Sequence, residues 1–110
     1  MIQETLSEIE SRLRRAGSVK PETRNELLGL MATLRAEVET LSKTHAEQAR
    51  SIAGFTTVST HEATRETKNP ELVDLSLRGL ASSVAGFEDS HPKLVEVVNR
   101  VCTSLSNLGI

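Results

Sequence analysis

The amino-acid sequence predicts an all-α fold, an antiparallel helical hairpin that carries a short N-terminal helix. Apolar residues recur at alternating spacings of four and three along most of the chain, which is the pattern of one helix face. Prolines stand where new helices are expected to begin, because the fixed φ of proline suits the first helical turn. With two Phe and no Trp or Tyr among 110 residues, the core must consist of aliphatic side chains, which suits helix packing. The length fits a single domain over residues 1–110.

A first helix is predicted over residues 2–16. Its apolar residues fall on one stripe, and Gly17 supplies the usual C-terminal stop. The stripe consists of Ile2, Leu6, Ile9, Leu13 and Ala16.

A longer, coiled-coil-like helix is predicted over residues 21–55. Pro21 suits its first position, and Glu22 complements the dipole at its N-terminus. The seam of this helix consists of Leu27, Met31, Leu34, Val38, Leu41, His45, Gln48, Ile52 and Phe55. Its length of about four heptads is typical of a coiled coil. The polar residues His45 and Gln48 leave two interpretations open: they mark a solvated part of the seam, or they fix its pairing.

Residues 56–69 are predicted to form a Thr-rich connector. This segment loses apolar residues and gains β-branched and capping ones, as mobile links do. Ser59 and Glu62 have the spacing of a capping box, so a short helical turn could restart there.

The second half predicts helices over residues 70–89 and 91–108. Asn69 is suited to cap the first of them, and Pro70 to open it. The apolar phase continues past Pro92, which permits either one kinked helix or two helices that meet near Ser90. The stripe consists of Val73, Leu77, Leu80, Val84, Phe87, His91, Leu94, Val98, Val101, Leu105 and Leu108.

The two halves are of similar length, so they are expected to pair as an antiparallel hairpin on which the first helix folds back. Leu28 and Leu30 flank the first stripe, and Leu72 and Leu75 flank the second, so both apolar faces are wider than a two-helix contact needs. We therefore expect a second copy to complete a helical bundle, as a symmetric dimer. The expected interface consists of Leu27, Met31, Leu34, Val38, Leu41, Ile52 and Phe55.

The amino-acid composition limits the classes of binding partner and the cellular compartment that we expect. The 13 basic residues stand against 15 acidic ones, so the chain lacks the basic excess that binding to nucleic acid uses. The lone Cys102 excludes an intrachain disulfide and favours a reducing compartment. The sequence shows neither a signal-peptide pattern nor an apolar run long enough to span a bilayer, so we expect a cytoplasmic protein without a membrane partner.

Glu88 and His91 are the strongest candidates for metal chemistry. A Glu and a His three residues apart on a helix form half of the di-iron site of ferritin-like bundles. Pro92 biases His91 away from helical geometry, however, so we expect both side chains to bond to free backbone groups at a helix junction. Cys102 follows Val101, a residue of the second apolar stripe, and is expected to be a small buried hydrophobe. The sequence predicts neither a catalytic residue nor a cofactor.

The segment Phe87-Glu88-Asp89-Ser90-His91-Pro92-Lys93-Leu94 and the ending Leu108-Gly109-Ile110 resemble a bacterial family described as domain of unknown function 4404. The stretch from Pro21 to Leu28 looks similar as well. The resemblance implies an intracellular bacterial helical protein and assigns no activity, ligand or residue role.

These observations favour a non-enzymatic scaffold or protein-interaction module that acts through coiled-coil-like self-association. Two alternatives remain: a ferritin-like metal protein that uses Glu88 and His91, and a helical regulator or chaperone that binds a different protein.

Overall fold

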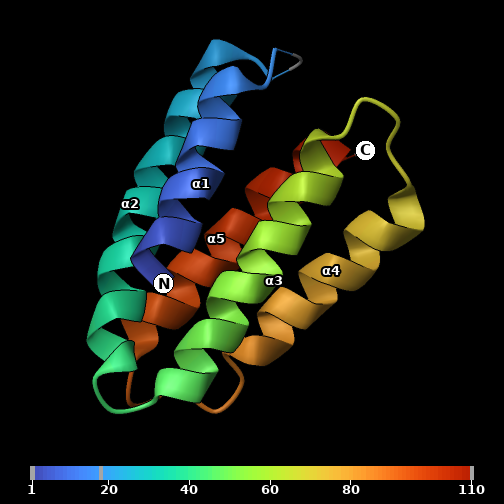
Figure 1. Ribbon diagram of the computed structural model, residues 1–110. Coiled ribbons are helices and arrows are strands. Elements are labelled where there is room, and N and C mark those ends of the chain that lie inside the picture. The colour runs from blue at the N-terminus through green and yellow to red at the C-terminus, as the bar shows by residue number, and fades with distance from the viewer. Residues whose placement is uncertain (1, 18, 110) are drawn as a thin grey trace.

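Five helices form one bundle in the computed structural model, which describes residues 2–17 and 19–109 (Figure 1). The helices are α1 (Ile2–Arg15), α2 (Pro21–Ser42), α3 (Ala46–Thr64), α4 (Pro70–Ser83) and α5 (Pro92–Gly109). The predicted all-α class is confirmed.

Successive helices run in opposite directions (Figure 1). Helices α2, α3 and α5 all contact one another, while α1 packs on α2 and α3, and α4 packs on α3 and α5. Helix α3 therefore touches each of the other four. The bundle measures 37 × 24 × 22 Å along its principal axes.

The predicted helix over residues 21–55 is wrong, because the chain reverses between Ser42 and Ala46. His45 has φ −135° and ψ 63°, outside the helical region. The hydroxyl groups of Ser42 and Thr44 donate to the carbonyl oxygens of Glu39 and Leu41, at 2.6 and 3.4 Å, as such residues do where a helix ends. The reversal lets the two halves of the seam face the same core.

The two polar seam residues lie at this reversal. His45 is in the turn, and Gln48 is exposed in the first turn of α3. The first interpretation, a solvated part of the seam, therefore describes Gln48, whereas His45 is half-buried in the turn.

The predicted connector over residues 56–69 is also wrong over most of its length, because α3 continues to Thr64. Its hydroxyl groups donate to carbonyl oxygens one turn earlier: Thr56 to Ile52 at 2.7 Å, and Thr64 to Thr60 at 2.6 Å. Polar side chains satisfied in this way can be buried, and Thr56 and Ser59 are 0% exposed. The link to α4 shrinks to residues 65–69.

The sequence permitted either one kinked helix or two helices in the second half of the chain, and the structure has two helices. Helix α4 ends at Ser83, before the predicted residue 89, and α5 begins at Pro92. Gly86 has φ 95°, the left-handed region that glycine adopts without strain. The chain thereby turns back, and α5 runs antiparallel to α4 (Figure 1).

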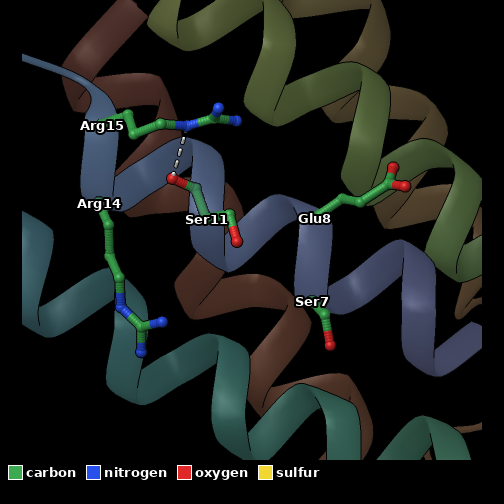
Figure 2. Close-up of a pocket in the computed structure, with 5 residues that line it drawn as sticks. All are labelled: Ser7, Glu8, Ser11, Arg14 and Arg15. Carbon is green, nitrogen blue, oxygen red and sulfur yellow. Dashed lines mark hydrogen bonds between the residues drawn. The ribbon is translucent and has the colours of Figure 1, made fainter.

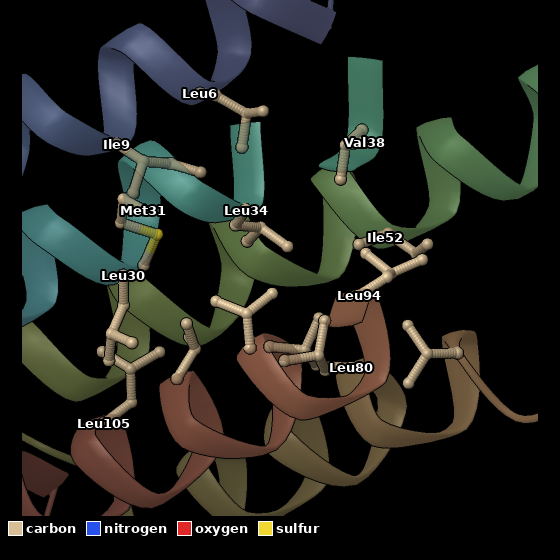
Figure 3. Packing of buried hydrophobic residues seen from close by; sticks show 14 of the residues in the cluster. Leu6, Ile9, Leu30, Met31, Leu34, Val38, Ile52, Leu80, Leu94 and Leu105 are labelled. Carbon is tan, nitrogen blue, oxygen red and sulfur yellow. The ribbon is translucent and has the colours of Figure 1, made fainter. Parts of the chain in front are cut away.

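All five helices contribute to one aliphatic core. Figure 3 shows Leu6 and Ile9 of α1, Met31, Leu34 and Val38 of α2, Ile52 of α3, Leu80 of α4, and Leu94 and Leu105 of α5 directed toward one another. The predicted dimer interface is wrong for six of its seven residues. Leu27, Met31, Leu34, Val38, Leu41 and Ile52 are 0% exposed within a single chain. The reversal after Ser42 brings α3 onto the seam, and α1 and α5 cover the remaining width.

Among the residues that the structure describes, none of the helices has the length and apolar character that crossing a membrane requires.

Candidate interaction surface

Exposed large hydrophobic side chains of the described residues gather on two neighbouring helices. Phe55 and Val58 of α3 are 41% and 47% exposed, and Leu72 and Leu75 of α4 are 39% and 65% exposed. We call these four residues the α3/α4 surface. Phe55 is thus the one member of the predicted interface that reaches solvent.

A glycine positions the aromatic ring of this surface. A Cβ atom on Gly79 would lie 2.4 Å from Cε1 of Phe55, so the ring occupies the space where a side chain of α4 would otherwise be. One turn further along the pair, the hydroxyl of Ser59 donates to the carbonyl oxygen of Ser76 at 3.4 Å. The two helices therefore approach closely through small residues.

Leu72 and Leu75 extend this apolar area along α4. Their spacing from Gly79, three and four residues at a time, places all three on neighbouring positions of one helix face. Val58 lies one turn after Phe55 on α3. Phe55, Leu72 and Leu75 therefore lie along the α3–α4 pair, and Val58 lies on the same pair of helices.

Charged groups border the apolar area along α4. Glu71 is exposed in the first turn of the helix, and Arg78 lies about two turns later. Arg78 Nη2 pairs with Asp74 Oδ2 at 2.9 Å, and the two side chains are 76% and 60% exposed. The outer face of α4 thus carries acids toward its N-terminus and a base toward its C-terminus.

A second feature is a groove of about 530 Å³ between α1 and α3. Ile9 and Val58 supply apolar lining, and Arg12 and Arg15 supply guanidinium groups. Glu62, at the same groove, accepts a hydrogen bond from Arg65 at 2.8 Å and so has its charge compensated. The groove continues the α3/α4 surface past Val58.

The polar surface of α1 is open and does not converge on a point. Figure 2 shows Ser7, Glu8, Ser11, Arg14 and Arg15 along one helix, with their side chains spread in different directions. Arg15 Nε donates to the carbonyl oxygen of Ser11 at 3.3 Å, within the helix itself. This arrangement is that of a solvated helix face.

Glu88 and His91 lie at the α4–α5 junction. Glu88 Oε2 accepts a hydrogen bond from the backbone N–H of Gly86 at 2.8 Å, as expected of a junction acid. The imidazole of His91 differs from the expectation, because its Nδ1 lies 2.9 Å from the hydroxyl of Ser90 and not at a backbone group.

The ring of His91 also completes an aromatic cluster at this end of the bundle. Its centroid lies 5.5 Å from that of Phe87 and 6.1 Å from that of His45, both in edge-on geometry. This cluster joins the α2–α3 turn to the α4–α5 turn. Within residues 2–17 and 19–109, no group of three or more His, Cys, Asp or Glu side chains is placed to hold a metal ion.

Cys102 is half-buried, with its sulfur 3.8 Å from the carbonyl oxygen of Leu77. Burial raises the pKa of this thiol, because a thiolate there would lose hydration. The thiolate is the nucleophilic form, so this environment suppresses its reactivity.

No family model, curated protein or solved structure matches the chain. The resemblance to domain of unknown function 4404 therefore remains an expectation that rests on the residues quoted for it.

Sequence reasoning missed Val58, because it assigned that residue to a connector. It noted Leu72 and Leu75 as side chains beside the main stripe, which was the available signal for the α3/α4 surface. The pattern could not show that the main stripes would be covered within the chain while these flanking residues stay exposed.

Proposed function

We propose that the protein is a non-enzymatic helical interaction module that associates with a second copy of itself through the α3/α4 surface. The observation that carries this proposal is Leu75, which is 65% exposed among further exposed apolar side chains on the same two helices. Soluble monomers expose such residues singly, whereas contiguous apolar areas mark interaction sites. With its single thiol, the module fits a reducing compartment, the cytoplasm.

The expected association is reversible and depends on concentration. Complete burial of a Leu or Phe side chain contributes about 1.5–3 kcal/mol, and the residues of this surface are already partly covered. Loss of translational and rotational freedom costs about 4–15 kcal/mol, so two small apolar surfaces leave a modest net affinity. The core of each copy is complete without the partner, so each copy should remain folded on dissociation.

The alternatives gain less support. A ferritin-like site would need Glu88 free to ligate a metal, and this carboxylate is engaged by the backbone of Gly86. Catalysis would need convergent polar groups, whereas the half-buried Cys102 has a raised pKa and the polar side chains of α1 spread apart. A regulator of a different protein would use the same α3/α4 surface. A wild-type protein that stays monomeric at every concentration would favour that alternative.

The test compares Leu75→Glu with Ala81→Glu in the purified chain of residues 1–110. Both substitutions add the same charge to an exposed position of α4, but only the first lies on the α3/α4 surface. Sedimentation velocity over a wide concentration range should show a monomer–dimer equilibrium for the wild type and for Ala81→Glu. Leu75→Glu should remain monomeric with an unchanged circular dichroism spectrum.

Two results contradict the proposal. A dimer of undiminished affinity in Leu75→Glu would place the interface elsewhere. A wild-type protein that is monomeric at every concentration would leave the α3/α4 surface to a different protein.

A further inference from the structure

The outer face of α4 carries the acids Glu71 and Asp74 toward its N-terminus and the base Arg78 toward its C-terminus. The apolar Leu75 lies between Glu71 and Arg78. Glu71 precedes Leu75 by one turn, and Arg78 follows it by about one turn, with all three exposed. At the standard rise per residue, Glu71 and Arg78 lie roughly 10 Å apart along the helix axis. Such a face is complementary to its own reversed copy.

We infer that Glu71 and Arg78 select the partner of the α3/α4 surface: a second copy whose α4 packs antiparallel, so that each Glu71 faces Arg78 of the other copy. This inference rests on the proposed function and adds the orientation of the dimer and the residues that set it. In a two-fold symmetric contact, every pair of unlike residues occurs twice. One pair of positions therefore supplies two charge contacts.

The position of the symmetry axis follows from the sequence spacing. An axis that passes between Asp74 and Leu75 brings Glu71 opposite Arg78 at both ends. The same axis brings the two Leu75 side chains together at the centre, and Leu72 and Phe55 lie beside them toward α3. Apolar burial and charge pairing thus require the same alignment.

The parallel alignment is disfavoured by the same residues. It would place Glu71 against Glu71 and Arg78 against Arg78, so like charges would meet at both ends of the contact. Charge patterns of this kind select an orientation because they weaken the wrong alignment as well as stabilise the right one.

The ion pair between Arg78 and Asp74 does not prevent this arrangement. Its side chains are 76% and 60% exposed, and an exposed pair of this kind is weak. A guanidinium group has five N–H donors, enough to hold Asp74 of its own helix and Glu71 of the second copy together.

Charge reversal with mixing tests the inference. Glu71→Arg alone would oppose Arg to Arg twice, and Arg78→Glu alone would oppose Glu to Glu twice. Each variant alone should therefore self-associate roughly tenfold more weakly than the wild type, because two contacts change from attraction to repulsion. In an equimolar mixture, each variant supplies the charge that the other lacks. Sedimentation velocity and native mass spectrometry should then detect a heterodimer close to wild-type affinity.

The matched control is the pair Glu96→Arg and Arg100→Glu on the exposed face of α5. These variants carry the same net charges as the test pair, and each should self-associate as the wild type does. High salt should weaken the wild-type dimer and the mixed dimer alike.

The inference is overturned if Glu71→Arg and Arg78→Glu each dimerise like the wild type, or if their mixture associates no more strongly than either alone. The comparison of Leu75→Glu with Ala81→Glu distinguishes a failure of the proposed interaction surface from a failure of the proposed antiparallel orientation. Loss of dimer in Leu75→Glu together with indifference to the charge reversals would retain the interaction surface and reject the antiparallel pairing. A monomeric wild type would reject both.

Discussion

The ring of Phe55 on α3 occupies the space beside Gly79, so this contact bears on the stability of α4. Glycine in the middle of a helix costs about 0.5–1 kcal/mol relative to alanine. At Gly79 this cost is offset by the ring of Phe55, which fills the free space against α4. Gly54, in the middle of α3, has nothing within 4 Å of its potential Cβ and gains no such contact. The two glycines therefore offer a matched comparison.

We expect Gly54→Ala to raise the free energy of unfolding by about 0.5–1 kcal/mol, because alanine is the better helix former and meets open space. Gly79→Ala should gain less or destabilise, because its Cβ displaces the ring of Phe55. In a Phe55→Ala background, Gly79→Ala should recover the full gain. Urea denaturation of the four variants measures these differences. Equal stabilisation by Gly54→Ala and Gly79→Ala with Phe55 present would show that the ring does not occupy the glycine position.

The starts of α2, α4 and α5 were predictable from single residues, whereas the start of α3 and the ends of α2, α3 and α4 were not. Asn69 was expected to cap α4, and its Oδ1 accepts hydrogen bonds from the N–H groups of Glu71 and Leu72 at 3.0 and 3.4 Å. Pro21, Pro70 and Pro92 open α2, α4 and α5 as the sequence indicated. The reversal after Ser42 has no comparable marker. The apolar phase continues through it, because α2 and α3 present their faces to the same core.

The C-terminal half of α3 was misjudged because of its composition. Thr and Ser favour caps and turns when their hydroxyl groups compete with the backbone. Here the hydroxyl of Thr57 donates to the carbonyl oxygen of Ala53 at 3.0 Å, in the same manner as that of Thr56 to Ile52, and the helix continues. The burial that decides this outcome depends on α1 and α4, which local sequence does not reveal.

Limited proteolysis tests whether this segment is part of a packed helix, as in the structure, or a mobile connector, as its composition suggested. We expect trypsin to cleave first after Lys68, which lies in the exposed segment between α3 and α4, and to leave Arg50 within α3 intact. Arg65 should be cut more slowly than Lys68, because it is held by Glu62 at 2.8 Å. Mass spectrometry of the early fragments identifies the order. Early cleavage at Arg50 would mean that α3 opens readily and that its polar half is not packed.

The whole bundle buries the apolar stripes that the sequence had assigned to a dimer. Long side chains of α2 reach two neighbouring helices: Arg35 pairs with Glu10 of α1 at 3.4 Å, and Glu26 accepts a hydrogen bond from Ser104 of α5 at 3.0 Å. The width of the apolar faces was visible in the sequence, and so was the need for further helices to cover them. Periodicity identifies a buried face but does not name the element that covers it. Within one chain, α1, α3 and α5 cover the face of α2.

Because Val38 lies in the core of a single chain, substitutions at this position are expected to impair folding and not dimerisation. Val38 is 0% exposed, so Val38→Glu would bury an unpaired charge at a cost of several kcal/mol, comparable with the 5–15 kcal/mol that typically stabilises a domain. We expect this variant to be largely unfolded at every protein concentration. The milder Val38→Ala should lower the free energy of unfolding by about 2 kcal/mol, through lost burial and a small cavity.

A double mutant then tests whether the core and the α3/α4 surface contribute independently to the free energy of unfolding. Helices α2 and α4 do not contact one another in the described bundle, so the effects of Val38→Ala and Leu75→Glu should add within about 0.5 kcal/mol. The cost of Val38→Ala should accordingly be the same in the monomeric Leu75→Glu background as in the wild type, as measured by urea denaturation at matched concentrations. If the cost instead disappeared in the monomeric background, Val38 would act through the contact between copies, because a residue that stabilises only the dimer cannot affect a chain that no longer dimerises.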